Sequence, residues 1–298
     1  MDNEDRILPS TRAALDLSDQ ERILFLRQPR WIGYTRSKDV LGRLEALLRY
    51  PSTHRMQNLL VIGETNNGKT TLVRRFSRLH PAQDNPGGEN TIVPVLLLQA
   101  PPFPEEGRLY DSILDALNAP YRPSESAGKK QVQVTKLLRT VGLRMLIIDE
   151  IHHLLAGSLA RQRHFLNVLK YLGNDLQIPI VGVGTVEAIR AVATDPQLAN
   201  RFEPVVLKRW EMDREYLSLL ASFEKLLPLR RTSTLTEQTL ALKLLSMSEG
   251  TIGELTTLLA VATEHAILSG QERIDLEVLR YLDWTPASDR GRHAARLA

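Results

Sequence analysis

Short apolar runs alternate with longer amphipathic segments over the first two thirds of the chain. Each run has about the length of a β-strand and is rich in Leu, Ile and Val. Between the runs, apolar residues recur at helical spacing, as over 39–48, 109–117 and 165–176. Buried strands that alternate with helices are typical of a parallel sheet covered on both faces, so we predict an α/β domain with a five-stranded parallel sheet flanked by helices. The five predicted strands are residues 59–62, 92–98, 145–148, 178–183 and 204–207.

The strand-like runs stop after the fifth one, and the remaining pattern is helical. Thr234 and Glu237 have the spacing of a capping box that opens a helix. Thr251 and Glu254 repeat this spacing, and Asp275 is placed to cap a third helix. We therefore predict four regions: an N-terminal arm over 1–28, the α/β domain over 29–211, a small all-α lid domain over 212–285, and a disordered basic tail over 286–298.

The composition excludes several kinds of chemistry. The 298 residues include no cysteine, which excludes disulfides, thiol catalysis and cysteine-based zinc sites. No apolar run approaches the roughly 20 residues of a membrane span, and the polar, acidic start is unlike a secretory signal. We expect a soluble, cytoplasmic protein with no membrane partner.

A small excess of basic residues permits nucleic-acid binding without demonstrating it. The formal net charge is +3, and most basic side chains of a soluble protein are simply solvated. Lys129 and Lys130 stand out because we expect them in a loop that follows Gly128. The basic clusters are Arg27/Arg30/Arg36/Lys38, Lys129/Lys130, Lys208/Arg209 and Arg290/Arg292/Arg296.

Residues 63–70, GETNNGKT, fit the phosphate-loop pattern G-x-x-x-x-G-K-[ST]. An apolar strand precedes the pattern and a helical segment follows it, which is the context that such a loop requires. Backbone N–H groups would converge on phosphate oxygens, the Lys69 ammonium would contact the β- and γ-phosphates, and the Thr70 hydroxyl would ligate Mg²⁺. The predicted ATP-binding residues here are Gly63, Glu64, Thr65, Asn66, Asn67, Gly68, Lys69, Thr70 and Thr71.

An acidic pair ends the third predicted strand. Asp149 and Glu150 follow four apolar residues and would lie at the carboxyl edge of the sheet, where open α/β sheets bind ligands. We expect Asp149 to hold Mg²⁺ and Glu150 to act as the general base that activates water. The following His152 and His153 are interpreted as packing residues, because neighbouring helical positions point in different directions.

These motifs resemble those of AAA+ ATPases, and most closely those of the TniB/TnsC group of transposition regulators. Residues 55–63 leading into the phosphate loop, and residues 178–185, carry much of the resemblance, which spans roughly residues 20–285. The resemblance implies that Ile32 and Gly33 line the adenine pocket. It also implies that Thr185 is the polar sensor of the fourth strand and that Arg201 is an arginine finger for a neighbouring subunit.

The resemblance implies a function that spacing alone does not. Members of this group assemble on double-stranded DNA with ATP as a ring or helical filament, and recruit or activate a DDE transposase. A TniQ-type targeting protein is a further partner that the resemblance implies. One departure is that residues 249–255, EGTIGEL, contain no arginine where many AAA+ lids sense the γ-phosphate.

Three other functions stay open at this point. A small-metabolite kinase would share the phosphate loop, but the acidic pair and the helical C-terminal region argue against it. An AAA+ helicase or replication loader would share the ATPase site. A nucleotide-gated scaffold that scarcely hydrolyses ATP would share it too.

Overall fold

A computed structural model describes residues 7–88, 90–291 and 295, and these residues form two compact units. The α/β unit comprises Arg36–Lys208, and the helical unit comprises Met1–Thr35 together with Arg209–Ala298. This division differs from the predicted one, because the segment predicted as an arm belongs to the helical unit. Within the described residues, no helix is long and apolar enough to cross a membrane.

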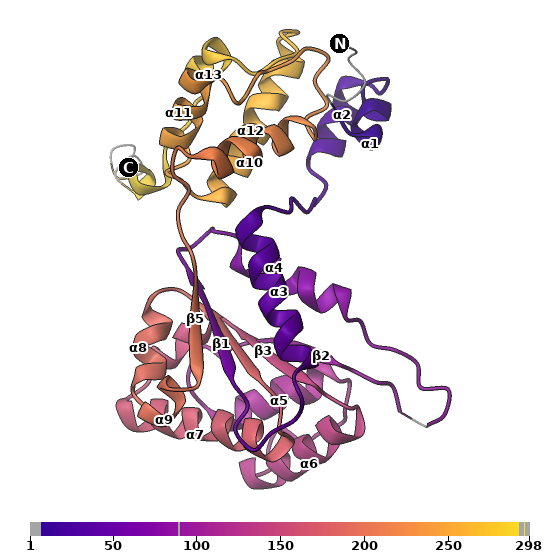
Figure 1. The fold of residues 1–298 in the computed structure, drawn as a ribbon, viewed down its shortest axis with the longest axis vertical. Coiled ribbons are helices and arrows are strands. Elements are labelled where there is room, and N and C mark those ends of the chain that lie inside the picture. Colours follow the sequence, from indigo (N-terminus) through magenta and orange to yellow (C-terminus); the bar gives the residue numbers. More distant parts are fainter. Residues whose placement is uncertain (1–6, 89, 292–294, 296–298) are drawn as a thin grey trace. The chain divides into compact units, whose positions relative to one another are not determined.

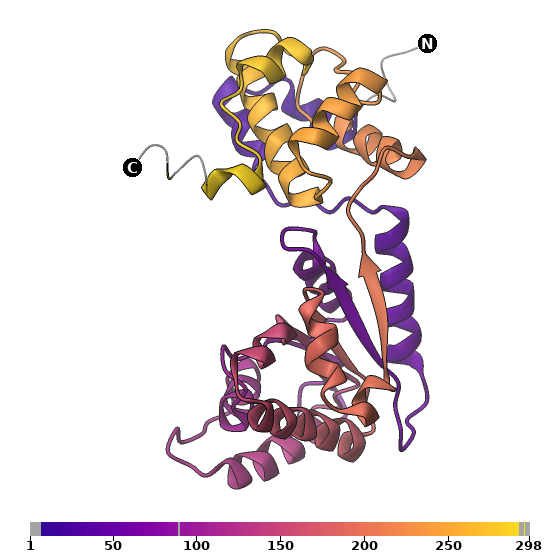
Figure 2. The same cartoon turned by 90° about the vertical axis from the view of Figure 1, so that its left-hand side faces the viewer.

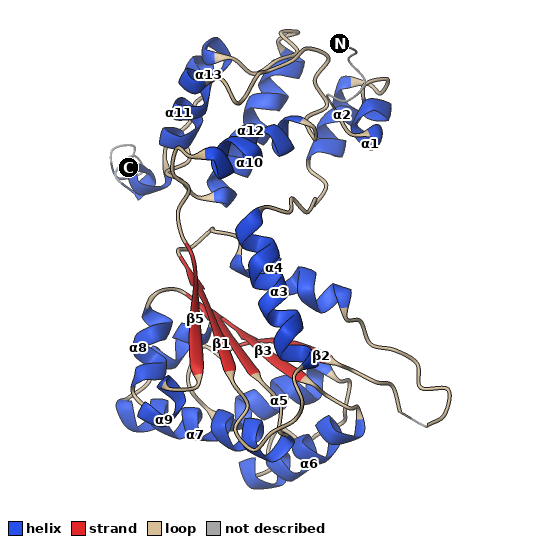
Figure 3. Cartoon of the chain, in the orientation of Figure 1, coloured by secondary structure: helices blue, strands red, loops and turns tan. Residues whose placement is uncertain are grey.

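The α/β unit contains the predicted parallel sheet (Figures 1 and 3). Its strand order is β2-β3-β4-β1-β5, and all neighbouring strands pair in parallel. The prediction of a five-stranded parallel sheet is therefore confirmed, with strand boundaries that differ by at most three residues. The strands are β1 (Asn58–Gly63), β2 (Val95–Gln99), β3 (Met145–Asp149), β4 (Ile180–Gly184) and β5 (Phe202–Leu207).

Helices cover both faces of this sheet (Figure 2). One face carries α3 (Thr35–Arg49) and α4 (Lys69–Leu79). The other face carries the remaining helices, because the crossovers that follow β2 run in the opposite direction along the sheet from the one that follows β1. These are α5 (Glu106–Ala116), α6 (Ala127–Thr140), η2 (Ile151–Ala156), α7 (Leu159–Leu176), α8 (Glu187–Ala193) and α9 (Pro196–Ala199).

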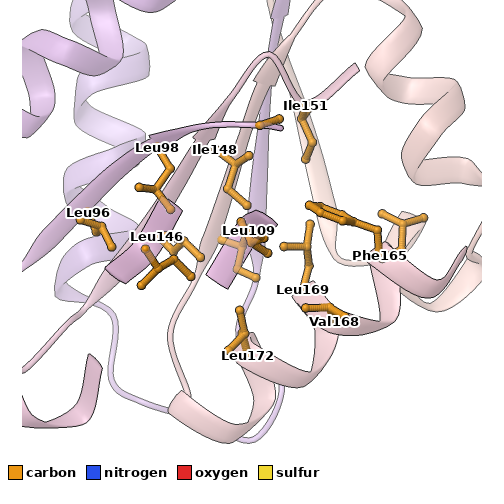
Figure 4. Packing of buried hydrophobic residues seen from close by; sticks show 14 of the residues in the cluster. Leu96, Leu98, Leu109, Leu146, Ile148, Ile151, Phe165, Val168, Leu169 and Leu172 are labelled. Atoms are coloured by element: carbon orange, nitrogen blue, oxygen red, sulfur yellow. The ribbon is translucent and has the colours of Figure 1, made fainter. Parts of the chain in front are cut away.

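The core of the α/β unit is aliphatic, as the scarcity of aromatic residues predicts. Leu146 and Ile148 of β3 are fully buried beneath Leu109 of α5 and Leu169 of α7 (Figure 4). The aromatic ring of Phe165 also packs in this cluster. This packing fixes β3 in the middle of the sheet and with it the position of the acidic pair that follows.

The helical unit is built from six α-helices in its described residues. Ile23 of α2 packs into the same cluster as Leu219 of α10 and Leu258 of α12, so the N-terminal helices are part of this core. Tyr34 and Trp210 pack edge to face, with ring centroids 5.1 Å apart. The helices are α1 (Pro9–Ala14), α2 (Asp19–Leu26), α10 (Arg214–Glu224), α11 (Gln238–Met247), α12 (Ile252–Leu268) and α13 (Leu276–Tyr281).

Only one of the three predicted helix caps forms as expected. Asp275 accepts from the backbone N–H groups of Glu277 and Val278, as predicted for α13. Glu237 is itself the N-cap of α11, so Thr234 is not its cap. Thr251 precedes α12, but its hydroxyl donates to the Ser248 carbonyl at 3.2 Å instead of capping the helix.

A buried ion pair joins the two ends of the helical unit. The side chain of Arg22 is fully buried, and it contacts the Glu272 carboxylate through both Nη atoms. Arg22 also donates to the Pro228 carbonyl, and Arg230 adds a second positive partner to Glu272. Burial alone would raise the pKa of Glu272, but the hydrogen bond and charge of Arg22 and of Arg230 outweigh it, and the pKa is lowered.

Part of the region predicted as a disordered tail is ordered. Ala287–Asp289 form the short helix η3, and Ser288 hydrogen-bonds to Glu249. Arg290 pairs with the buried carboxylate of Glu254 at the start of α12. Residues 292–294 and 296–298 of the predicted tail, including Arg292 and Arg296, lie outside the described residues.

Candidate nucleotide-binding site

The phosphate loop connects β1 to α4 at the carboxyl edge of the sheet. Gly63 ends β1, and α4 begins at Lys69. Asn66 (φ 60°) and Gly68 (φ 81°) adopt left-handed backbone conformations, which fold the loop tightly around its own N–H groups. Gly63 lies so close to β5 that a Cβ would be 2.9 Å from the Leu207 carbonyl oxygen. The glycine therefore serves the close approach of the loop to the sheet.

The side-chain amide of Asn67 stabilises the loop and is not free to contact a ligand. The residue is buried, and its Nδ2 donates to the carbonyls of Leu207 and Lys208, at 2.8 and 3.1 Å. The side chain therefore ties the loop to the end of β5. Its predicted contact with ATP is left to its backbone N–H. Glu64, Thr65, Asn66 and Thr71 are exposed, and their predicted contacts with ATP stay predictions.

Lys69 lies inside the loop with its ammonium directed at loop backbone. The residue is 6% exposed, and Nζ donates to the Glu64 carbonyl at 2.7 Å. Burial lowers the pKa of Lys69, while the charges of Glu150 and Asp149 act in the opposite direction. A buried ammonium that already donates to a loop carbonyl is suited to exchange this oxygen for phosphate oxygens.

Thr70 and Asp149 meet across the carboxyl edge of the sheet. The Thr70 hydroxyl donates to Asp149 Oδ2 at 2.7 Å, and the Glu150 N–H donates to Oδ1 at 2.9 Å. Adjacent oxygen ligands of octahedral Mg²⁺ are about 2.9 Å apart, given Mg–O distances of about 2.0–2.1 Å. A hydroxyl and a carboxylate oxygen at this spacing, all-oxygen donors in a partly buried setting, fit the ion that the sequence predicts.

Glu150 adopts a strained backbone conformation at the end of β3. Its φ is 56°, in the left-handed region that a side chain with a Cβ seldom occupies. Such strain is retained where surrounding structure imposes it and clusters at functional sites. The half-buried carboxylate is next to the imidazole of His152, with Oε2 3.3 Å from Nε2. Sequence reasoning missed this partner, because it interpreted His152 as a packing residue.

Thr185 follows β4, the strand between β3 and β1, so it lies at the same edge as the phosphate loop and the acidic pair. Its hydroxyl hydrogen-bonds to the Glu187 side chain, and this is the main reason why the pKa of Glu187 is lowered. The structure thus brings Thr185 to the edge where its predicted sensor role places it. Glu187 was not singled out from the sequence, which offers no signal for it beyond its position after the strand.

Arg201 lies at the opposite edge of the sheet. Its carbonyl accepts from the N–H of Asn58, which begins β1, whereas the phosphate loop follows the last residue of that strand. Five further residues of extended strand separate the two by roughly 16–17 Å. Its Nη1 donates to Asn174 Oδ1 at 2.7 Å. Arg201 therefore does not belong to the phosphate site of its own subunit.

Ile32 and Gly33 belong to the helical unit. Ile32 is half-buried against the helical core, and Gly33 is exposed. Their predicted role in the adenine pocket stays a prediction.

One expectation about the basic residues is wrong. Lys129 and Lys130 lie within α6 and not in a loop. Lys130 is 3% exposed and pairs with Asp111 at 2.6 Å, because the turn of α6 directs its side chain at α5. Lys130 therefore has a structural role and is not available to contact DNA phosphates. Arg27 likewise pairs with Glu264 within the helical unit.

The comparisons with known proteins agree with the fold. ORC2 of Aeropyrum pernix, solved in ADPNP and ADP complexes, aligns with a TM-score of 0.61 at 15% identity, over 86% of this chain and 69% of that one. Cdc6p of Pyrobaculum aerophilum aligns with a TM-score of 0.59 at 16% identity, over 87% and 68%. ORC1 of Aeropyrum pernix in complex with DNA aligns with a TM-score of 0.55 at 15% identity, over 93% and 72%.

At these identities the structural likeness shows the fold alone, and that fold is the AAA+ ATPase fold. No curated protein matches the chain. The family described as bacterial TniB protein matches residues 22–212, a span that includes the phosphate loop, the acidic pair, Thr185 and Arg201. Because that match covers well over half of the 298 residues, the chain belongs to the TniB family.

Proposed function

We propose that this chain is an ATPase that binds double-stranded DNA, assembles on it as a homo-oligomer and presents that DNA to a DDE transposase. The observation that carries the ATPase part is the convergence of the phosphate loop with the acidic pair. The hydroxyl of Thr70 and the carboxylate of Asp149 are 2.7 Å apart, and Glu150 follows directly. This is the constellation that ATP hydrolysis needs: a cradle, a metal clamp and a base.

Each group has a distinct part in the proposed reaction. Mg²⁺, when bound, would neutralise charge on the phosphates, and Thr70 and Asp149 would hold it. Lys69 would bind the terminal phosphates through its buried ammonium. Glu150 would accept the proton of the attacking water, and Thr185 would orient groups from the neighbouring strand. The strained backbone of Glu150 supports this assignment, since it holds the carboxylate at the strand end.

The position of Arg201 supports assembly into a ring or helical filament. A guanidinium at the edge remote from its own phosphate loop is placed to serve a different subunit. Among the described residues its guanidinium hydrogen-bonds only to the Asn174 side chain, which leaves donors for a further acceptor. An ATPase site completed in this way hydrolyses ATP only in the homo-oligomer, which couples turnover to assembly.

Membership of the TniB family supports the role in transposition, with a DDE transposase and a TniQ-type targeting protein as partners. The solved neighbours that contain DNA, ORC1 of Aeropyrum pernix and the Drosophila ORC, support DNA binding by this fold. Binding should be dominated by phosphate contacts. Its logarithmic affinity should therefore fall linearly with the logarithm of salt concentration and depend little on sequence.

The similarity to ORC and Cdc6p structures keeps an AAA+ helicase or replication loader as the second candidate function. Purified protein with ATP and duplex DNA should stimulate a cognate transposase and should not load a helicase onto DNA. The reverse result would replace the transposition role while leaving the ATPase assignment intact.

The deciding experiment is Glu150→Gln, assayed for ATP binding, hydrolysis and residence time on DNA. Loss of a general base costs about 10²–10⁴ in rate, while Lys69 and Asp149 keep their contacts, so ATP should still bind. If the ATP-bound form grips DNA, long-lived assemblies should accumulate on the duplex. In a transposition reaction this variant should still present target DNA but should discriminate poorly between good and bad sites.

The matched control is Glu203→Gln, which changes an exposed carboxylate of β5 that pairs with Arg43. It should hydrolyse ATP as the wild type does. Wild-type hydrolysis by Glu150→Gln would remove Glu150 as the base. Rapid dissociation from DNA despite blocked hydrolysis would show that the ATP-bound form is not the one that grips DNA.

A further inference from the structure

Three potential metal ligands meet beside the nucleotide site. Glu150, His152 and His153 are each half-buried, and one ligand atom from each lies within 4.8 Å of the others. The two imidazole centroids are 5.0 Å apart. From the sequence we expected the rings to diverge. They converge because both residues belong to the first turn of η2, where side chains lean towards the helix N-terminus and thus back over Glu150.

His152 is held by packing with one nitrogen directed at Glu150. Its Nε2 is 3.3 Å from Glu150 Oε2, which equals the ligand-to-ligand spacing of about 3.3 Å in a tetrahedral site with Zn–N and Zn–O distances of about 2.0 Å. Its Nδ1 is buried against the backbone of Gly184, where an added Cβ would be 3.2 Å away. Among the described residues Nδ1 has no hydrogen-bond partner, so Nε2 is the nitrogen that is available for a ligand role.

His153 has the second contact that metal-binding imidazoles usually make. Its Nδ1 is 3.4 Å from the carbonyl oxygen of Ala100, which follows β2. Donation of the Nδ1 proton to a backbone carbonyl selects the tautomer whose Nε2 carries a lone pair, and it fixes the ring plane. Separations of up to 4.8 Å exceed the tetrahedral edge of about 3.3 Å, so closure on a metal ion would require these half-buried side chains to rotate.

We propose that Glu150, His152 and His153 form a binding site for a transition metal ion of the zinc class, with its fourth position open to solvent. Two imidazoles and one carboxylate suit Zn²⁺, Co²⁺ and Ni²⁺, whereas Mg²⁺ prefers oxygen ligands throughout. The site is therefore chemically distinct from the all-oxygen pair of Thr70 and Asp149. The cluster should prefer transition metal ions and the oxygen pair should prefer Mg²⁺, so the two sites can be told apart by the metal that each binds.

The consequence for activity rests on the proposed function. A Glu150 carboxylate engaged as a metal ligand cannot take a proton from water, so Zn²⁺ would stop hydrolysis. The phosphate loop and its Lys69 lie outside the cluster, so ATP binding would persist. Zinc would thus produce the same ATP-bound, non-hydrolysing state as Glu150→Gln, but reversibly.

Binding is tested first, without nucleotide, on full-length protein that carries no histidine tag. Co²⁺ is titrated into metal-free protein, and the visible absorption of low-coordinate Co²⁺ is recorded. We expect an intense band that saturates at one Co²⁺ per chain and disappears when Zn²⁺ is added. Co²⁺ bound to the oxygen pair of Thr70 and Asp149 would give only the weak spectrum of an octahedral ion.

Loss of an outer-shell partner typically weakens metal binding by about 10–100-fold. His153→Ala removes a direct ligand and should weaken Co²⁺ binding by more than this. The matched control is His164→Ala, which removes the exposed histidine that is 3.1 Å from Glu106, and it should leave the titration unchanged. An absent band, or one that His153→Ala does not alter, overturns the site whatever the ATPase activity proves to be.

Activity is tested second. Stoichiometric Zn²⁺ should inhibit ATP hydrolysis by the wild type, and a chelator should restore it. His153→Ala should be less sensitive to Zn²⁺, with each rate compared with that of the same variant in chelator. If Co²⁺ binds as described but Zn²⁺ leaves hydrolysis unchanged, the metal site stands and the assignment of Glu150 as the base fails. If neither variant nor wild type hydrolyses ATP under any condition, the proposed function fails while the spectroscopic result still decides the site.

Discussion

The two units of this chain differ in how far apart in the sequence their decisive contacts lie. In the α/β unit, the reactive groups occupy strand ends, and each set is contiguous: residues 63–70, 149–150 and 185. In the helical unit, the buried contact between Arg22 and Glu272 joins positions separated by 250 residues. The difference shows that the chemistry of this protein is specified by short patterns, whereas the integrity of its helical unit depends on pairings that no short pattern reveals.

The comparison predicts that substitutions in the α/β unit can change rates without unfolding anything, while substitutions in the helical unit act on stability. A convenient probe separates the units. All three tryptophans, Trp31, Trp210 and Trp284, belong to the helical unit, so intrinsic tryptophan fluorescence reports its unfolding alone.

The largest effect is expected for Arg201→Ala. An arginine finger supplied by a neighbour is worth about 10³–10⁵ in rate where it is fully engaged, so hydrolysis should fall steeply. ATP binding by the monomer should stay unchanged, and so should unfolding followed by far-ultraviolet circular dichroism, which includes the α/β unit that contains Arg201. Mixing this variant with Lys69→Ala should restore part of the activity, because each supplies the group that the other lacks.

Asn174→Ala is the control that separates a catalytic from a structural role of Arg201. It removes the 2.7 Å hydrogen bond from the Arg201 guanidinium to Asn174 Oδ1 and leaves the arginine in place. Equal losses in both variants, with no recovery on mixing, would identify Arg201 as a structural residue of its own subunit.

The next effect concerns the helical unit. Arg22→Met leaves the Glu272 carboxylate without its buried partner, and breaking a buried ion pair costs about 3–5 kcal/mol of unfolding free energy. Denaturant unfolding followed by tryptophan fluorescence measures this loss. The double variant Arg22→Met, Glu272→Gln should cost clearly less than the sum of the two single variants. Additive losses would mean that the two side chains do not stabilise the unit as a pair.

The same pair gives the helical unit a dependence on acid. Since the pKa of Glu272 is lower in the folded than in the unfolded chain, its contribution is complete above the unfolded value and is lost as the pH falls through the folded value. Wild type should therefore lose stability over the acidic range more steeply than Glu272→Gln. Parallel curves for the two proteins would contradict this origin of the acid sensitivity.

Gly63→Ala tests close packing at the phosphate loop. The added Cβ would be 2.9 Å from the Leu207 carbonyl oxygen, and overpacking of this kind costs about 1–3 kcal/mol. Unfolding followed by far-ultraviolet circular dichroism should shift, and ATP affinity should fall with it. Gly42→Ala is the control: it lies within α3, a Cβ there meets nothing within 4 Å, and it should not destabilise the unit.

The smallest effect is expected at the start of α13. Asp275→Ala removes an N-cap that accepts two backbone N–H groups, which should cost about 1 kcal/mol in the helical unit. Asp275→Asn keeps an acceptor and should retain most of this. Equal losses for the two substitutions would point to the neighbouring pair of Asp275 with Arg273 instead of the cap.

The sequence predicted the sheet and the acidic pair because each depends on neighbours in the chain. Four apolar residues before Asp149 define a buried strand, and a strand end defines where the carboxylates lie. The failures were of another kind. Lys130 looked like a loop cation because it follows Gly128, a poor helix former, yet α6 begins at Ala127 and buries it against Asp111.

Residues 1–28 looked like an arm for a related reason. Leucines are scattered through this segment, and the ion pair that Arg22 forms has its other half at position 272. The contact of His152 with Glu150 was missed because it forms at the turn from β3 into η2, where Glu150 has a left-handed backbone that sequence periodicity does not encode. In each case the observed structure depends on a tertiary contact or on a locally strained backbone, and neither can be predicted from the pattern of neighbouring residues.

The buried guanidinium of Arg22 also constrains the order in which the chain can fold during synthesis. Arg22 is synthesised 250 positions before Glu272. Helices α1 and α2 are therefore exposed to solvent until the partner of Arg22 has been synthesised. The α/β unit is complete once Lys208 has emerged, and can close before the helical unit has its second half. The α/β unit can thus fold first during translation, and the helical unit folds last, when its N-terminal and C-terminal segments are both available.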